Sequence, residues 1–270
     1  MKIISFNTNS IRIREHQLQA LIAKHQPDII GIQETKVIDE MFPIEMIRAL
    51  GYEAVYHGQK THYGVALLYK LTPTTTQKGF AGDNADSQRR FIQAEFQHNG
   101  KKLVVMNGYF PQGESRDNDI KFPAKKKFYA DLFQHLQQNY SPQDAIILMG
   151  DMNVAPVDLD VGIGADNARR WLQTGKCSFL PEEREWLQKI IGWGLTDTFR
   201  HHQPDADNLY SWFDYRSRGF ENNPQRGLRI DLIMASHALA GSVIDTGIDY
   251  DIRGMDKPSD HCPIWVEFKD

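Results

Sequence analysis

The sequence lacks the features that mark disulfide-rich, zinc-binding or membrane proteins. Its two cysteines, Cys177 and Cys262, lie far apart with no Cys-x-x-Cys pair, so neither a disulfide framework nor a zinc site is indicated. No stretch approaches the roughly 20 apolar residues of a membrane span. Asn7 and Asn9 end the first apolar run well short of a signal-peptide core. We expect a protein of the reducing cytoplasm without a membrane partner.

Repeats, low-complexity tracts and an excess of basic residues are also missing. The formal net charge of -4 argues against a uniformly basic protein that wraps nucleic acid, although it leaves room for local patches. With 270 residues and 41% hydrophobic content the chain can bury a sizeable core, and no linker interrupts it. A single domain spanning residues 1–270 is predicted.

Alternating short strands and helices predict an α/β fold. A strand at 2–6, a helix around 18–22 and a strand at 29–32 form an expected right-handed crossover. Asn99-Gly100 is a strong hairpin signal between two further strands, so antiparallel pairing enters the same fold. The other predicted elements are strands at 90–96, 103–109, 145–149, 230–235 and 262–268, a helix at 128–136 and a helix opened by Pro181.

One segment places two polar side chains directly after a buried strand. The apolar run 145–149 continues into Gly150-Asp151-Met152-Asn153. Because side chains two residues apart in an extended chain point to one side, Asp151 and Asn153 can face the same site, and Gly150 allows close approach of backbone or ligand. A strand followed by an Asx turn explains the same residues without a function.

Polar side chains also fall at the ends of other predicted strands. Asn7, Glu34, Tyr109 and Asp151 each close a strand. Asp231 and the pair Asp260-His261 open strands, so they reach the same edge if those strands run in the opposite direction. A mixed arrangement therefore predicts one pocket that holds Asn7, Glu34, Tyr109, Asp151, Asn153, Asp231, Asp260 and His261.

The charge of this pocket predicts a divalent metal. Four converging carboxylates repel one another and raise some of their pKa values unless a cation is present. Oxygen ligands such as Glu34 and Asp151, with Asn7 or Asn153 nearby, suit Mg²⁺ or Mn²⁺. Mg²⁺ usually keeps waters that phosphate oxygens can replace, so a phosphate ester is the expected substrate.

His261 is the candidate for proton transfer. Its ordinary pKa of about 6.5 allows it to take or give a proton near neutral pH, especially if Asp231 orients it. A lone histidine is more often structural. Here the neighbouring Asp260 and the Pro258-Ser259 turn favour a functional role.

Three groups of basic residues are candidate phosphate-binding surfaces. They are Lys121, Lys125, Lys126 and Lys127; Arg169 and Arg170; and Arg216, Arg218, Arg226 and Arg229. The third group also carries Trp212, Phe213, Tyr215 and Phe220, and aromatics among cations suit a surface that stacks on bases while holding phosphates. A solvated face, or an aromatic loop packed on the core, explains the same residues equally well.

Five motifs, in this order, resemble a known family. They are Gln33-Glu34-Thr35-Lys36, Gly108-Tyr109-Phe110-Pro111, Gly150-Asp151-Met152-Asn153, Arg229-Ile230-Asp231-Leu232 and Ser259-Asp260-His261. Together they look like the exonuclease III branch of the endonuclease/exonuclease/phosphatase superfamily, and the resemblance covers nearly the whole chain. Longer strings at 110–116, 171–181 and 211–215 resemble that branch rather than the superfamily at large.

The resemblance implies a four-layered α/β sandwich, with two mixed β-sheets packed face to face, helices outside and the active site at one rim. It also implies a monomeric, Mg²⁺-dependent DNA repair nuclease in which Mn²⁺ can substitute. Such an enzyme digests double-stranded DNA from the 3′ end, cuts 5′ to abasic sites and removes 3′ blocking phosphates.

Roles for single residues follow from the same resemblance. Glu34 binds the metal, with Asn7, Asp151 and Asn153 close by, and Asp260 binds a second metal or its water. Asp151 generates or positions the attacking water. Asn153 and Tyr109 hold the scissile phosphate, and His261, oriented by Asp231, contacts or protonates a phosphate oxygen. Which group is the general base stays open.

The expected DNA contacts lie around this centre. Arg90 and Gln112 match phosphate-contacting positions, and Trp212 with Leu228 matches the apolar wall that receives a baseless sugar. The chain departs from the family pattern at Ser10, where a glycine is expected, and at 222–225, which is lengthened. The second departure lies in the loop around Trp212, which is expected to face DNA.

Other members of the superfamily are alternatives. Inositol polyphosphate phosphatases, sphingomyelinases and RNA deadenylases share the metal-and-histidine core. No Trp-Cys-Asp-Arg string of the inositol phosphatase kind precedes the last motif, and no secretion signal or membrane-binding segment suits a sphingomyelinase. A non-catalytic binding module is the third option, against which the intact metal and histidine motifs argue.

Overall fold

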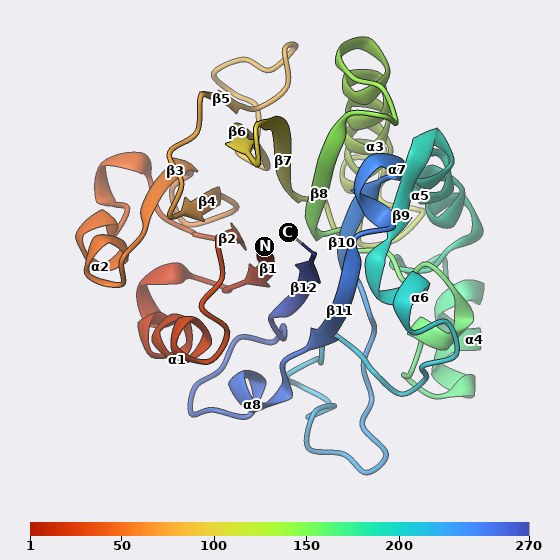
Figure 1. Cartoon of the computed structure of the whole chain (residues 1–270). Helices are drawn as coiled ribbons and strands as arrows, with labels where there is room; N and C mark the ends of the chain where they lie inside the picture. Colours follow the sequence, from red (N-terminus) through yellow and green to blue (C-terminus); the bar gives the residue numbers. More distant parts are fainter. Residues whose placement is uncertain (270) are drawn as a thin grey trace.

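The computed structural model describes residues 1–269, which form two six-stranded β-sheets packed face to face with helices on both outer faces (Figure 1). The strand orders are β11-β12-β1-β2-β4-β3 and β5-β6-β7-β8-β10-β9. Each sheet combines parallel and antiparallel pairs. The predicted four-layered sandwich of two mixed sheets is confirmed.

The first sheet is built from the two ends of the chain. Its strands are β1 (Lys2–Asn7), β2 (Ile29–Gln33), β3 (Glu53–His57), β4 (Val65–Tyr69), β11 (Val243–Ile248) and β12 (Ile264–Phe268). Helix α1 (Glu15–His25) connects β1 to β2, which run parallel, as the predicted crossover requires. The other pairs in this sheet are antiparallel.

The second sheet comes from the middle of the chain. Its strands are β5 (Thr75–Lys78), β6 (Phe91–His98), β7 (Lys101–Tyr109), β8 (Ala145–Asp151), β9 (Leu195–Asp197) and β10 (Asp231–Ser236). Asn99 and Gly100 both have positive φ, at 51° and 72°, and form the predicted hairpin turn between β6 and β7. β7 and β8 are parallel, and the remaining pairs are antiparallel.

Helices cover the outer faces of the two sheets. Those beside the first sheet are α1, α2 (Ile44–Ala49) and α8 (Tyr250–Arg253), and those beside the second are α3 (Lys121–Asn139), α5 (Pro181–Gly194) and α7 (His237–Ala240) (Figure 1). Helix α6 (Thr198–His202) contacts both β10 and β11, and α4 (Ala165–Gln173) packs on a small apolar cluster around Phe179 and Ile230. Short 3-10 turns span Ile11–Ile13, Asp39–Met41 and Asp158–Asp160. Pro181 occupies the first turn of α5, where its missing N–H is harmless.

Strand β8 shows why a buried strand reads as one unbroken apolar run. Ile147 and Met149 pack against the first sheet, whereas Ile146 and Leu148 face α3 and α5, so both faces are buried. Gly150 ends the run with φ +147°, and a Cβ there would lie 1.9 Å from the carbonyl oxygen of Gly108 on β7. The close backbone approach predicted for Gly150 is therefore an approach of β7 to β8.

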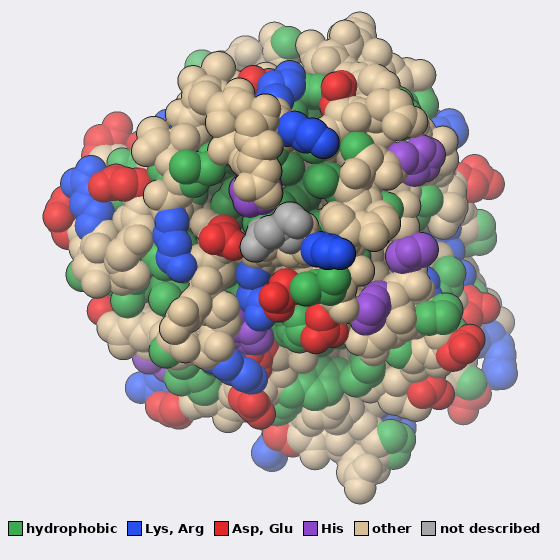
Figure 2. Space-filling model, in the orientation of Figure 1, with side chains coloured by type: hydrophobic (Ala, Val, Ile, Leu, Met, Phe, Trp, Pro, Cys, Tyr) green, Lys and Arg blue, Asp and Glu red, His purple; other side chains and the backbone are tan. Residues whose placement is uncertain are grey.

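The chain begins and ends at one end of the sandwich. The amino group of Met1 donates to the carbonyl of Phe268 at 2.9 Å, at the opposite end of β1 from Asn7. On the face where the termini lie, side chains of both charges are interspersed (Figure 2). Among residues 1–269, every helix is too short or too polar to cross a membrane.

Candidate active site at one rim of the sandwich

The strand ends that carry the predicted polar residues meet at one rim. β1 and β2 run parallel, so Asn7, which ends β1, and Glu34, which follows β2, lie side by side. β8 and β10 run antiparallel with Asp151 opposite Asp231. β12 runs antiparallel to β1, so His261, just ahead of β12, reaches the same rim. The opposed strand directions inferred from the sequence are confirmed.

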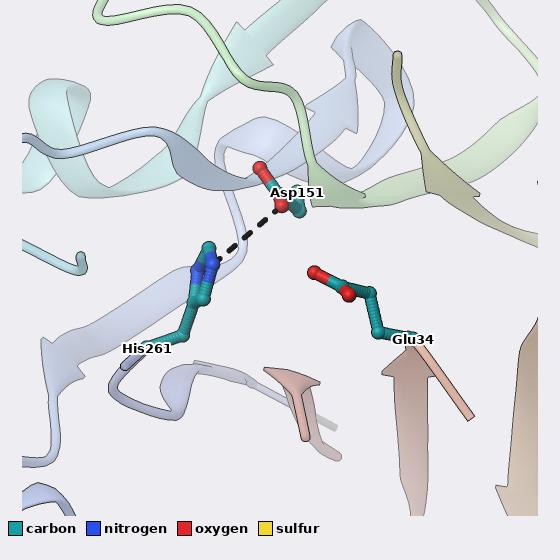
Figure 3. Close-up of side chains that lie close together, drawn as sticks. All are labelled: Glu34, Asp151 and His261. Carbon is teal, nitrogen blue, oxygen red and sulfur yellow. Dashed lines mark ion pairs between the residues drawn. The ribbon is translucent and has the colours of Figure 1, made fainter. Parts of the chain in front are cut away.

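Glu34, Asp151 and His261 form the centre of this rim (Figure 3). One possible ligand atom from each lies within 4.8 Å of those of the other two. Asn7 Nδ2 donates to Glu34 Oε1 at 2.9 Å and to Asp151 Oδ2 at 3.0 Å, while its Oδ1 accepts from the N–H of Asn9 at 3.0 Å. The Asn7 amide therefore bridges two carboxylates in a fixed orientation.

His261 is held from behind by Asp231. His261 Nδ1 lies 2.8 Å from Asp231 Oδ2, both side chains are almost fully buried, and Nε2 lies 3.7 Å from Asp151 Oδ2. The Asp231 carboxylate is fixed in turn, because Ser211 Oγ donates to its Oδ2 at 2.6 Å and accepts from the N–H groups of Ile230 and Asp231 at 3.0 Å. This arrangement gives an oriented imidazole that can hold or move a proton at Nε2.

Burial and neighbouring charges set the protonation of these groups. Burial raises the pKa of Asp151 to about 7, with Asp231 and Glu34 adding to the rise and His261 opposing it. Burial alone would lower the pKa of His261, but Asp231 and Asp151 outweigh it and raise that pKa. Burial, then Glu34 and Asp151, raise the pKa of Tyr109 well above its ordinary range. Near neutral pH the site thus favours an imidazolium and a neutral phenol.

Asn153 is fixed on three sides. Its backbone is left-handed, with φ 53°. Its N–H donates to Asp151 Oδ1 at 3.0 Å, and its carbonyl accepts from Lys125 Nζ at 2.8 Å. Its side-chain Nδ2 donates to the carbonyl of Phe110 at 3.0 Å. The bond from Asn153 N–H to the Asp151 side chain is an Asx turn. The turn and the functional interpretations of this segment are therefore compatible, since the side chains that make the turn also line the cavity.

Asp260 lies at the side of this centre. Its Oδ1 accepts from Asn9 Nδ2 at 2.9 Å and its Oδ2 accepts from Trp212 Nε1 at 3.1 Å. Lys36 donates to Asn9 Oδ1, and its Nζ lies 2.9 Å from Glu34 Oε2. Polar contacts thus run from the indole of Trp212 to Glu34. The predicted metal role of Asp260 stays a prediction.

A cavity of about 360 Å³ opens at this rim. The predicted residues that line it are Glu34, Tyr109, Gln112, Asp151, Asn153, Trp212, Asp260 and His261. The structure adds Trp171, Lys176, Ser178, Asp214, Arg216 and Ile230. Most of these lie in the strings at 171–181 and 211–215 that resemble the exonuclease III branch, and Arg216 belongs to the third basic patch, so a signal for them was present in the sequence.

Two predicted DNA-binding residues lie outside the cavity lining. Leu228 is 1% exposed and packs against Ile230, which itself lines the cavity. Arg90 is 7% exposed, and its guanidinium lies 4.0 and 4.6 Å from the ring centroids of Tyr63 and Tyr109. It also donates to the carbonyl of Tyr109 at 3.1 Å. Each residue contacts a side chain that lines the cavity, Ile230 in the case of Leu228 and Tyr109 in the case of Arg90.

Two of the predicted basic patches need correction. Lys125 is fully buried against Glu183, and Arg229 is buried with hydrogen bonds to Asp160 and Asp197. A buried charge is tolerated only when it is paired and hydrogen-bonded, and both cations meet that condition. They are structural groups in the interior and cannot bind phosphate at the surface.

The aromatics of the third patch divide between core and site. Phe213 is fully buried and meets Phe220 edge-on, and the guanidinium of Arg253 lies 4.6 Å from the Phe220 ring centroid. Trp212 lines the cavity, and Tyr215 is 44% exposed. The packed-loop interpretation therefore holds for some of these aromatics and the binding-surface interpretation for others.

The donor set at the rim fits a hard divalent cation. Glu34 and Asp151 offer carboxylate oxygens on either side of the Asn7 amide, and the raised pKa of Asp151 reflects negative charge crowded into a buried place. Oxygen donors of this kind are those that Mg²⁺ and Mn²⁺ take in proteins. His261 Nδ1 faces Asp231, and its Nε2 lies 3.7 Å from Asp151 Oδ2, so the hard oxygen donors of this centre come from the carboxylates.

Two face-to-face mixed sheets with carboxylates, an amide and an oriented histidine at one rim define a class of phosphoester hydrolases. The chain belongs to the endonuclease/exonuclease/phosphatase family, whose sequence profile matches residues 4–261. Within that family, exodeoxyribonuclease III of Haemophilus influenzae is 57% identical over 269 residues, covering 100% of both chains. The exodeoxyribonuclease of Bacillus subtilis is 29% identical over 266 residues, covering 98% of each.

Solved structures agree with these sequence relatives. A 3′ phosphatase from Neisseria, bound to a product DNA hairpin, superposes with a TM-score of 0.89 at 34% identity. An AP endonuclease from Archaeoglobus fulgidus superposes with a TM-score of 0.90 at 32% identity. Both comparisons cover 100% of the two chains. The predicted fold and the resemblance to the exonuclease III branch are confirmed.

Proposed function

We propose that the chain is a divalent-metal-dependent DNA repair nuclease that digests double-stranded DNA from the 3′ end, cuts 5′ to abasic sites and removes 3′ blocking phosphates. The observation that carries the proposal is the buried Asp231–His261 pair facing Asp151 and Glu34 in one cavity. Relatives named as exodeoxyribonuclease III, AP endonuclease and 3′ phosphatase share the fold along the full chain. The three activities are one reaction, since each breaks a phosphoester bond at a 3′ oxygen.

The side chains that face the cavity divide the work of hydrolysis. Asn153 uses one amide hydrogen on Phe110 and has the second for the scissile phosphate, and the neutral phenol of Tyr109 is another donor. His261, held by Asp231, places an Nε2 proton at a phosphate oxygen. Asp151 positions the attacking water and can accept its proton. Preorganised donors of this kind stabilise charge as it develops in the transition state.

Mg²⁺ is the proposed cofactor, and Mn²⁺ is expected to substitute. Glu34 would hold it, with Asn7, Asp151, Asn153 and Asp260 as the remaining candidate ligands. When bound, the cation supplies positive charge that offsets the charge on the phosphate and the departing oxygen.

The proposed substrate is duplex DNA with an abasic site or a 3′ end. Trp212 and Ile230 give the cavity an apolar wall, and Lys176 and Arg216 are cations at the same cavity. A baseless sugar is cheap to extrude and offers no base edge, so an apolar wall can receive it. Lys176 and Arg216 can form ion pairs with the DNA phosphates that flank the baseless sugar.

We further infer a monomeric, single-domain protein of the cytoplasm. One apolar core lies between the two sheets and joins residues from both, which supports a single domain over 1–270. One chain holds every predicted site residue, which supports a monomer. Cys177 and Cys262 are free and buried, which suits a reducing compartment.

A nicking assay tests the proposal. The substrates are a duplex with one stable abasic analogue and a duplex with a 3′ phosphate, each incubated with Mg²⁺, with Mn²⁺ or with chelator. We expect incision and phosphate release with either metal and neither reaction with chelator. Metal-independent incision, or no incision beside rapid phosphate release from an inositol polyphosphate, would refute the proposal. His261→Ala controls for a contaminating nuclease.

A further inference from the structure

A buried ion pair lies directly beneath the cavity. Lys125 of α3 and Glu183 of α5 are both fully buried, with Lys125 Nζ against Glu183 Oε1. The same Nζ donates to the backbone carbonyl of Asn153 at 2.8 Å and to that of Gln112 at 3.2 Å. Both of these residues line the cavity. One buried ammonium group therefore joins two segments of the cavity wall.

Glu183 extends this support to a third segment. Its Oε2 accepts from the N–H of Ser178 at 2.8 Å and from that of Leu180 at 2.9 Å, and Ser178 lines the cavity. All the polar groups around the pair are thus hydrogen-bonded, as a buried charge pair requires. The hydrogen bonds of this pair to the cavity-lining residues Gln112, Asn153 and Ser178 all involve main-chain atoms.

The stem of Lys125 also fixes the turn that follows Gln112. Gly113 has φ +88°, and a Cβ at this position would lie 3.0 Å from Lys125 Cδ and 2.8 Å from Cys177 Sγ. The turn therefore rests directly on the Lys125 side chain. A glycine is needed there both for the backbone conformation and for the close approach.

We propose that Lys125 is a positioning residue for phosphate hydrolysis, which acts through Asn153 and Gln112 and never touches the substrate. The inference rests on the proposed function, because it takes the side chain of Asn153 as a phosphate contact. Asn153 stands in a left-handed conformation with three anchors: Asp151 at its N–H, Phe110 at its side-chain amide and Lys125 at its carbonyl. Without Lys125 the peptide after Asn153 can rotate, which releases the left-handed backbone and shifts the side-chain amide relative to the phosphate.

Three variants separate positioning from plain stability. Lys125→Met leaves a buried carboxylate unpaired and frees both carbonyls. Glu183→Gln disturbs the charge pair but keeps the ammonium that holds the carbonyls. The double variant Lys125→Met/Glu183→Gln removes the charge imbalance and still lacks the ammonium. The matched control is Lys127→Met/Asp131→Asn, which removes an exposed ion pair on the same helix.

Melting temperature and steady-state kinetics on an abasic duplex are measured for each variant. We expect each single variant to melt on the order of 10 °C below the wild type, and the double variant to recover most of that loss. kcat should fall about 100-fold in Lys125→Met and in the double variant, with KM nearly unchanged, because misplaced catalytic geometry costs rate. Glu183→Gln and the control should keep most of their kcat.

Two results would overturn the inference. In the first, kcat returns together with the melting temperature in the double variant. In the second, Lys125→Met and Glu183→Gln lose kcat equally. The wild-type enzyme tests the proposed function itself, which fails if the wild type does not cut the abasic duplex. If the wild type cuts and Lys125→Met cuts equally well, only the positioning role of Lys125 is refuted.

Discussion

Replacing Asp231 with asparagine tests the chemistry of the site with the smallest change of shape. The carboxylate lies 2.8 Å from His261 Nδ1 in a buried place and raises the pKa of that imidazole. Asparagine has the same size and can still bond to Ser211 Oγ, which now anchors the carboxylate. The substitution therefore removes a charge and leaves the scaffold in place.

The expected loss follows from the type of bond. A hydrogen bond between charged partners contributes about 1.5–3 kcal/mol, and a factor of ten in rate corresponds to about 1.4 kcal/mol. If the Asp231–His261 bond acts mainly in the transition state, Asp231→Asn should lower kcat roughly 10- to 150-fold. Its effect on DNA affinity should be small, because Asp231 lies behind His261 and does not line the cavity.

Steady-state rates on an abasic duplex with saturating Mg²⁺ measure this effect, with Asp131→Asn, a partly exposed position outside the cavity lining, as the control. The double variant Asp231→Asn/His261→Ala should be no slower than His261→Ala alone, since Asp231 acts only through the imidazole. A kcat within twofold of the wild type, or a double variant that loses the product of both single effects, would show that the reasoning is wrong.

Further predictions concern the centre of the site and the fold around it. His261→Ala and Asp151→Asn should each lower turnover by orders of magnitude with DNA affinity largely intact in a binding titration; lost affinity would recast them as structural. Burial alone would raise the pKa of Asp249, but hydrogen bonds from His25 and a neighbouring lysine outweigh it and lower it to about 2, below the usual 3.8. Its ionised form therefore stabilises the fold above about pH 4, and this stabilisation is lost as the pH falls through about 2. The melting temperatures of the wild type and Asp249→Asn should therefore converge near pH 2, and a difference that grows there would contradict the prediction. Arg229→Met should cost about 3–5 kcal/mol in urea unfolding, because it leaves Asp197 without its cation and Asp160 with Arg200 alone; a loss under about 1 kcal/mol would contradict this.

The polar residues at the rim of the sandwich could be predicted from the sequence because each lies at the end of a predicted strand. An apolar run that stops at a polar residue, as at Asn7 or Asp151, marks both the strand and the edge it reaches. The direction of β10 and β12 then follows from which end of the run carries the polar group. Strands β3, β4, β5, β9 and β11 escaped prediction. β9 has three residues, and β5 and β11 are partly exposed without a clear apolar pattern, whereas β4 is a buried apolar run whose signal was present in the sequence.

The walls of the cavity were harder to predict than its centre. Lys176 and Arg216 come from irregular segments whose path is set by tertiary contacts, so spacing along the chain does not place them. Lys125 and Arg229 looked like surface cations because their acidic partners are remote, with Glu183 58 residues from Lys125 and Asp160 69 residues from Arg229. Pairings of that kind appear only once the chain is folded.

The centre of the site draws on both sheets. Asn7, Glu34 and His261 come from the first sheet and its edges, whereas Asp151 and Asp231 come from the second. A chain in which one sheet has formed alone therefore carries only part of the machinery. Hydrolysis at this site therefore depends on the docking of the two sheets, so activity should appear only after the whole chain has folded.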